Sequence, residues 1–141
     1  MSERPIIHAI HQVALPSAQL ARSVAFYRDT LGAELVATFD PPGLAFFRLG
    51  DVRLLVDHAG VASGGLTVGG AVVYFRVPDM DAGFKTLVDR GVAFLAPPQL
   101  VHRDEAGTFG PRGNEEWMAF FHDPDGNTLA LVTQRAGGAA A

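Results

Sequence analysis

The histidines are the first residues to consider for metal binding or acid–base chemistry. The chain has five, and no two of them have the HxH or HxxxH spacing that directs two imidazoles at one metal ion. His8 and His11 lie three residues apart in a strand-like run, so their side chains point to opposite faces. His102 lies in a polar run that is typical of a solvated surface; the alternative is a lid residue that contacts a bound ligand.

Four further side chains have the chemistry to hold a small molecule. Gln12 and Tyr74 could make polar contacts inside a cavity, or could bond to each other. Arg76 could bind a carboxylate or phosphate, although an arginine at a strand end also reaches solvent or pairs with an acid. Trp117 is either a ring on which a ligand stacks or a filler of the core.

Composition bounds the class of protein. A chain of 141 residues makes one domain or two closely packed half-domains. A formal net charge of -4 argues against nucleic acid or an anionic membrane surface as the partner. The absence of cysteine excludes disulfides, thiolate metal sites and a cysteine nucleophile. The first five residues are polar and no apolar run is long enough to span a bilayer, which predicts a cytoplasmic protein.

The elements that position these residues can be read from the apolar pattern of the first half. Ser17 is the predicted N-cap of a helix that ends at Gly32, because apolar residues follow it at three- and four-residue spacing. The small, glycine-rich segment 59–69 is the natural linker between halves. The strands expected in the first half are residues 7–15, 34–39, 44–49 and 51–57.

The second half repeats this order. Leu-Ala-Phe-Phe at 44–47 returns as Met-Ala-Phe-Phe at 118–121, and setting Gln12 on Val72 also sets Leu20 on Met80. A duplicated strand-helix-strand-strand-strand unit predicts two modules, 6–58 and 70–134, with a disordered tail at 135–141. The elements expected in the second module are a strand, a helix capped by Asp79, a short strand and a final strand pair, at 71–77, 79–90, 92–95, 116–122 and 127–133. The polar stretch 96–115 has no counterpart in the first half and predicts a loop that covers a site.

Three motifs occur in a fixed order along the chain. They are Val-Ala-Phe-Tyr-Arg-Asp-Thr-Leu-Gly at 24–32, Val-Pro-Asp-Met at 77–80 and Asp-Pro-Asp-Gly-Asn at 123–127. This series resembles the vicinal oxygen chelate superfamily, which includes glyoxalase I, bleomycin-resistance proteins and extradiol dioxygenases. The resemblance implies an α+β fold of two paired βαβββ modules, with curved sheets around a cavity and helices outside. It also implies a small-molecule ligand or substrate and a homodimer.

Alternation along the strands predicts which side chains line that cavity. A two-residue turn at 49–50 places Phe47 on one face with Val52 and Leu54. A four-residue turn at 123–126 pairs His122 with Asn127, and so places Trp117 and Phe121 with Ala130. These faces mix small, aromatic and polar residues as ligand cavities do, whereas the opposite faces are almost uniformly apolar and are expected to pack on the helices. The predicted ligand-binding residues are Gln12, Phe47, Tyr74, Arg76, His102, Trp117 and Phe121.

The resemblance also implies where a metal would bind. Metal-dependent members have a histidine on the first strand and a glutamate on the last strand of each module. The four matching positions in this chain are Gln12, Leu54, Val72 and Ala130. Only Gln12 could coordinate, and one neutral amide oxygen does not hold a divalent cation. No cofactor is therefore expected, and a metal would need a ligand from elsewhere, such as the stretch 96–115.

Three functions remain open on this reasoning. The first is a metal-free small-molecule-binding protein of the bleomycin-resistance type. The second is a metal-dependent lyase, isomerase or dioxygenase with atypical ligands, which the residues at the metal positions disfavour. The third is a metal-free enzyme in which Gln12, Tyr74, Arg76 or His102 polarises a substrate carbonyl.

Overall fold

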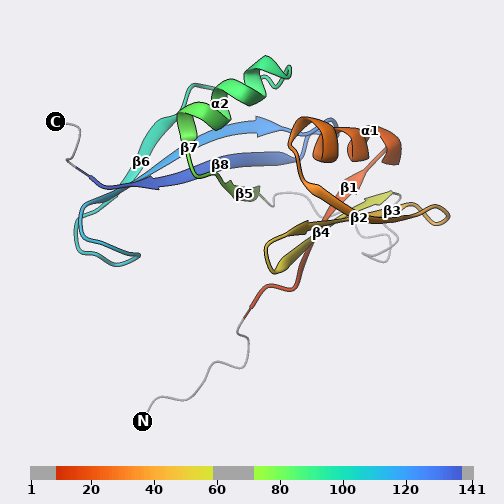
Figure 1. The fold of residues 1–141 in the computed structure, drawn as a ribbon, viewed down its shortest axis with the longest axis horizontal. Helices are drawn as coiled ribbons and strands as arrows, with labels where there is room; N and C mark the ends of the chain where they lie inside the picture. The colour runs from red at the N-terminus through yellow and green to blue at the C-terminus, as the bar shows by residue number, and fades with distance from the viewer. Residues whose placement is uncertain (1–8, 59–71, 138–141) are drawn as a thin grey trace, which may run out of the picture. The chain divides into compact units, whose positions relative to one another are not determined.

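A computed structural model describes residues 9–58 and 72–137 of the chain (Figure 1). The chain divides into two compact units, Met1–Val68 and Gly69–Ala141, each with its own sheet and helix. The strand start predicted at residue 7 and the linker predicted at 59–69 lie outside the described residues. Within the described ranges, neither helix has the length and hydropathy needed to cross a membrane.

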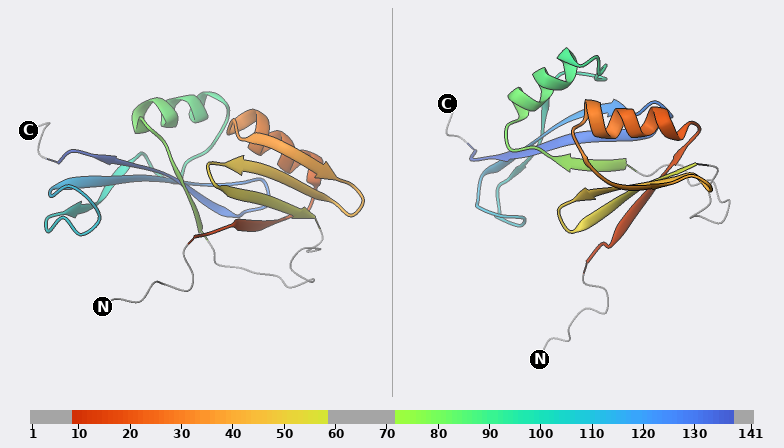
Figure 2. Two further views of the ribbon diagram at one scale, coloured as in Figure 1. Left: turned by 60° about the horizontal axis from the view of Figure 1, so that its bottom comes forward. Right: turned by 45° about the vertical axis from the view of Figure 1, so that its right-hand side comes forward.

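The first unit is a four-stranded sheet with one helical segment on one face (Figures 1 and 2). Its sheet order is β1-β4-β3-β2, with β1 parallel to β4 and the other pairs antiparallel. The helix α1 continues directly into a π-helical turn, η1, before β2 begins. The elements are β1 (Gln12–Ser17), α1 (Leu20–Ala25), η1 (Phe26–Thr30), β2 (Glu34–Phe39), β3 (Leu44–Leu49) and β4 (Val52–His58).

The second unit has the same topology, in the order β5-β8-β7-β6. Its elements are β5 (Val72–Arg76), α2 (Met80–Asp89), β6 (Gln99–Asp104), β7 (Asn114–His122) and β8 (Thr128–Arg135). Phe46 pairs with Leu55 on the inner strand of the first sheet, and Phe120 pairs with Ala130 at the same place in the second. The predicted α+β fold of two βαβββ modules is therefore confirmed.

The two helices begin differently. Asp79 caps α2 as predicted, because its carboxylate accepts a hydrogen bond from the Ala82 backbone N–H at 3.1 Å. Ser17, however, does not cap α1. It is the last residue of β1, and its buried hydroxyl bonds to the Ser23 hydroxyl at 2.6 Å. The Ser17 side chain thus ties the strand to the helix, and α1 starts without a side-chain cap.

The predicted loop at 96–115 is wrong in part, because residues 99–104 belong to β6 and residues 114–115 to β7. The strand β6 occupies its first half and pairs with β7, as β2 pairs with β3 in the first unit. This edge strand has five exposed residues in succession and a register shift between Leu100 and His102. No apolar alternation therefore marks it in the sequence. Only residues 105–113 form the connecting loop.

The helix of each unit also covers the opposite face of the sheet from the one predicted. The Tyr27 ring lies 5.7 Å from the Phe47 ring, and the Phe94 ring lies 5.1 Å from Phe121 and 4.5 Å from Phe84 on α2. Phe47 and Phe121 are completely buried beneath these helices. Small residues on this face, such as Ala45, give the helix room to approach the sheet. The mixture of small and aromatic residues thus reflects helix packing.

The register of the last hairpin differs from the prediction as well. His122 pairs with Thr128, so the turn contains the five residues 123–127. The Asp123 carboxylate accepts hydrogen bonds from the backbone N–H groups of Asp125 and Asn127 at 2.9 and 2.8 Å, and from the Asn127 side chain at 2.7 Å. These bonds hold Asn127 inside the turn. The one-residue shift moves Ala130 to the face of Phe120.

Candidate functional site on the helix-free faces

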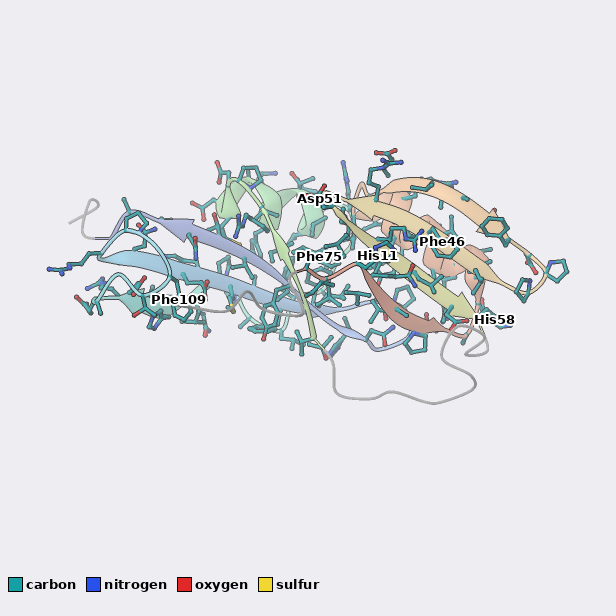
Figure 3. The ribbon with its side chains drawn as sticks, turned by 90° about the horizontal axis from the view of Figure 1, so that it is seen from below. His11, Phe46, Asp51, His58, Phe75 and Phe109 are labelled. Atoms are coloured by element: carbon teal, nitrogen blue, oxygen red, sulfur yellow. The ribbon has the colours of Figure 1, made fainter. Side chains whose placement is uncertain are left out.

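Each sheet has one face that its own helix does not cover, here named the helix-free face. Figure 3 labels Phe46, which lies on this face in the first unit. Strand pairing and alternation identify the side chains that share it. They include Gln12, Ala14, Leu44, Phe46, Arg48, Arg53, Leu55 and Asp57 in the first unit, and Val72, Tyr74, Arg76, Glu116, Met118, Phe120, His122, Thr128, Ala130, Val132 and Gln134 in the second.

In the second unit an aromatic pair and a cation lie on this face. The Tyr74 ring meets the Phe120 ring edge-on, with centroids 6.1 Å apart, and Tyr74 remains 52% exposed. Arg76 follows on the same strand beside Val132, and it is exposed. It makes no ion pair with any residue in the described ranges. The face thus offers an apolar wall next to an unpaired positive charge.

A shallow hollow lies at the far end of the same sheet. His102, Glu116 and Gln134 form a row across β6, β7 and β8, and the Gln134 amide donates to the Glu116 carboxylate at 3.3 Å. The hollow is small, with a cavity volume of about 10 Å³, which is room for about one water molecule. Its lining residues are His102, Asp104, Phe109, Gly110, Asn114, Glu115, Glu116 and Gln134.

The loop beside this hollow is held in shape by Asp104. The Asp104 carboxylate accepts hydrogen bonds from the backbone N–H groups of Thr108 and Phe109, both at 2.7 Å. The hydrogen bond from the Phe109 backbone N–H is the main reason that the Asp104 pKa is lowered, whereas burial of the carboxylate acts to raise it. The loop presents Phe109, 75% exposed, with its ring edge-on to His102 at 6.0 Å (Figure 3). Sequence reasoning missed Asp104, although the glycines that follow it were a turn signal.

Trp117 lies on the opposite face, which corrects its predicted place in the cavity. Its indole N–H donates to Glu115 at 3.2 Å, and the Arg135 guanidinium lies 4.6 Å from its ring. Arg103 donates to the same Glu115 carboxylate at 2.5 Å. The Arg103 guanidinium is the main cause that lowers the Glu115 pKa, followed by the Trp117 N–H. Trp117 therefore belongs to a surface cluster that joins β6, β7 and β8.

In the first unit the helix-free face centres on Arg53, the charged exception on a face whose apolar residues were expected to pack on the helix. Its guanidinium donates to His11 Nε2 at 2.9 Å and lies 5.6 Å from the centre of the Phe46 ring. Phe39 packs against Phe46, with the two ring centroids 5.9 Å apart, and the two rings together are here named the Phe46–Phe39 wall. Gln12 neighbours Arg53 in the strand pairing, and its side-chain oxygen is buried without a hydrogen-bond partner among the described residues.

The residues at the predicted metal positions do not fit a divalent cation. Gln12, Val72 and Ala130 lie on the helix-free faces, but Leu54 turns beneath α1 because its pairing partner is Phe47. The residue equivalent to Ala130 is Leu55, and its neighbour on the same face is the cation Arg53. Across the described ranges, no cluster of three histidine or acidic side chains could hold a metal ion.

Comparison with known proteins then identifies the family. The model of the glyoxalase/bleomycin resistance protein/dioxygenase superfamily matches residues 9–131. The chain belongs to this superfamily. A comparison with curated protein sequences gives no significant match.

Three solved structures have the same fold, one of them described as a superfamily member. A member from Sphaerobacter thermophilus is 25% identical, with a TM-score of 0.68 over 91% of this chain and 98% of that one. Lactoylglutathione lyase from Agrobacterium tumefaciens is also 25% identical, with a TM-score of 0.68 over 91% of this chain and 95% of that one. An integron cassette protein from the mobile metagenome of V. Cholerae, 21% identical, has a TM-score of 0.73 over 93% of this chain and 98% of that one.

The structure thus brings together some of the predicted ligand-binding residues of this superfamily member. Tyr74 and Arg76 share the helix-free face of the second sheet, and His102 borders the hollow. Gln12 lies on the corresponding face of the first sheet. The remaining three, Phe47, Trp117 and Phe121, lie on the opposite faces.

Proposed function

We propose that this protein is a small-molecule-binding protein of the glyoxalase/bleomycin-resistance type that holds its ligand without a divalent metal. The observation that carries the proposal is the exposed Tyr74–Phe120 pair beside the unpaired Arg76 on the helix-free face. Small-molecule sites combine such an aromatic wall with a few placed polar groups. Superfamily membership supports this reading, because the matched family groups proteins that act on or bind small molecules.

A metal-free enzyme is the second candidate. His102 and Glu116 are direct neighbours across β6 and β7, and both border the hollow. A histidine beside a carboxylate is a common arrangement for general acid–base catalysis. In this alternative His102 and Glu116 would act on the reacting group at the surface of the sheet, and the Tyr74–Phe120 wall would hold the rest of the substrate.

Tyr74→Ala tests the proposed binding face. We expect it to weaken the binding of hits from an aromatic fragment library about threefold to tenfold, because an edge-on ring contact is lost. The melting temperature should change little, since half of the side chain is already exposed. Ligand-observed NMR measures the affinities. Val88→Ala, which trims a similarly exposed apolar side chain on α2, is the control and should leave them unchanged. Equal affinities for Tyr74→Ala and the unaltered protein would contradict the proposal.

Native mass spectrometry tests two expectations together, the absence of a bound divalent metal and the formation of a homodimer. We expect a homodimer without a stoichiometric divalent metal, because the open sheets have edge strands that need cover and the donor set does not suit a cation. The proposal places this dimer in the cytoplasm, in line with a chain that has no cysteine. One tightly bound Zn, Ni, Mn or Fe ion that is lost in Gln12→Ala would overturn the metal-free assignment. A monomer mass would overturn the dimer.

A further inference from the structure

Arg53 is held in a fixed place on the helix-free face of the first sheet. One of its terminal nitrogens donates to His11 Nε2 at 2.9 Å, and its guanidinium lies over the Phe46 ring at 5.6 Å. Figure 3 shows His11 and Phe46 on this side of the strands. The guanidinium carries five N–H donors, and His11 takes one of them. No other described residue accepts a hydrogen bond from this guanidinium, so the rest of the fork can bind an anion.

The charge of Arg53 is not balanced within its own sheet. No carboxylate in the described ranges pairs with it. Its direct cross-strand neighbour is a second cation, Arg48, whose own ion-pair partner is Glu34 at 3.6 Å. Like charges opposite each other on neighbouring strands destabilise a sheet. A ligand with a negative charge would balance Arg53, as Glu34 balances Arg48.

An acceptor atom without a partner lies next to this cation. Gln12 is paired with Arg53 in the parallel ladder of β1 and β4, so the two side chains are neighbours on one face. The Gln12 side-chain oxygen is buried and accepts no hydrogen bond from any described residue. A buried oxygen of this kind costs free energy unless a donor reaches it. A hydroxyl or N–H group on a bound molecule would supply that donor.

We propose that Arg53, Gln12 and Phe46 form a recognition subsite for an aromatic carboxylate with a hydroxyl or N–H group next to the carboxylate. The Arg53 fork binds the carboxylate, the Gln12 oxygen accepts from the adjacent donor, and the Phe46–Phe39 wall contacts the ring. His11 positions the guanidinium through its Nε2. This subsite rests on the proposed small-molecule function and specifies the class of ligand.

Three probes of similar size separate these contacts. Phenylacetate has the ring and the charge, phenylacetamide is its neutral counterpart, and mandelate adds a hydroxyl beside the carboxylate. We expect phenylacetate to bind about tenfold to a hundredfold more tightly than phenylacetamide, because a hydrogen bond to a charged group is lost. Mandelate should bind about threefold to tenfold more tightly than phenylacetate, through the bond to Gln12. Titrations followed by ¹H–¹⁵N NMR give affinities and locate the shifted amides, expected in β1 and β4.

Four variants show which residues cause these differences in affinity. Arg53→Gln should abolish the preference for phenylacetate over phenylacetamide, and Arg53→Lys, which keeps the charge but not the fork, should restore part of it. Gln12→Leu should abolish only the advantage of mandelate. Arg28→Gln is the control, because it removes the same charge from the π-helical turn of the same unit, where Arg28 pairs with Asp29. It should leave affinities within about twofold, since distant charges are screened.

The outcomes separate this subsite from the proposed function as a whole. Equal affinity for phenylacetate and phenylacetamide would overturn the subsite while leaving the binding function in place. Unchanged preferences in a folded Arg53→Gln protein, or shifts confined to the second unit, would also overturn it. So would the absence of binding by both carboxylates up to about 10 mM, beyond the weak end of useful affinities. Equal fragment affinities for Tyr74→Ala and the unaltered protein concern the other unit and would contradict the proposed binding face alone.

Discussion

Replacing Phe121 by alanine is expected to lower the free energy of unfolding by about 3–5 kcal/mol, the usual cost of removing a large ring from a core. Phe121 is completely buried, and its ring contacts Phe94, which in turn contacts Phe84 on α2. Its removal leaves a cavity between the helix and the sheet. Urea unfolding followed by circular dichroism measures the loss.

Phe120→Ala is the matched control, because it removes the same ring from the next residue on the opposite face. Phe120 is only half-buried, so we expect a smaller loss of about 1–2 kcal/mol. Fragment binding should weaken in this variant, because Phe120 supports the Tyr74 ring. If Phe121→Ala proved the milder change, the assignment of the helix-covered face would be wrong.

Gly43→Ala is expected to destabilise the first unit by about 2–4 kcal/mol through strain in the backbone and a steric contact. Gly43 has a φ of +115°, and an added Cβ would lie 3.0 Å from the Cβ of His58. His58 cannot move away easily, because its N–H donates to the Gly43 carbonyl at 2.8 Å and its ring nitrogen donates to the Ser17 carbonyl at 3.1 Å. Figure 3 shows His58 at the end of β4. Thermal and urea unfolding measure the loss.

Gly50→Ala separates the backbone term from the steric one. Gly50 also has a positive φ, of +60°, but an added Cβ there meets no atom within 4 Å. We expect a cost of about 1–2 kcal/mol, which is that of the left-handed conformation alone. Equal losses in the two variants would show that the contact with His58 is relieved by a small shift and adds nothing.

The sequence predicted the architecture well wherever the signals were local. The bounds of β2 and β3 agree with the expected strands at 34–39 and 44–49, because turns rich in proline and glycine separate them. The turn between β3 and β4 lies at residues 50–51, one residue later than expected, and pairs Leu49 with Val52. Phe47 and Leu54 still share a face, as predicted, because moving the turn by one residue shifts the pairing by two residues, which is one full period of side-chain alternation.

The candidate site was harder to predict, because it depends on which face of each sheet the helix covers. Phe46 and Phe47 are adjacent and equally apolar, and only the contact of Phe47 with Tyr27 distinguishes their roles. The side-chain bonds of Asp123 decided the register of the last hairpin, and no apolar pattern reports such bonds. Arg53 is a charged residue between the apolar positions of Phe46 and Leu55 on its face, and this charge was the available signal for the subsite.

The π-helical turn in the first unit records a difference in length between the two halves. From Leu20 to the glycine that ends the helical segment, the first half is one residue longer than the second half from Met80 to Gly91. The extra residue is absorbed where the Leu31 N–H bonds to the Phe26 carbonyl, five residues back, at 2.9 Å. The pairing of Phe46 with its inner strand still matches that of Phe120. After duplication, an insertion in one copy could thus be accommodated by the helix alone, and the sheet kept its register.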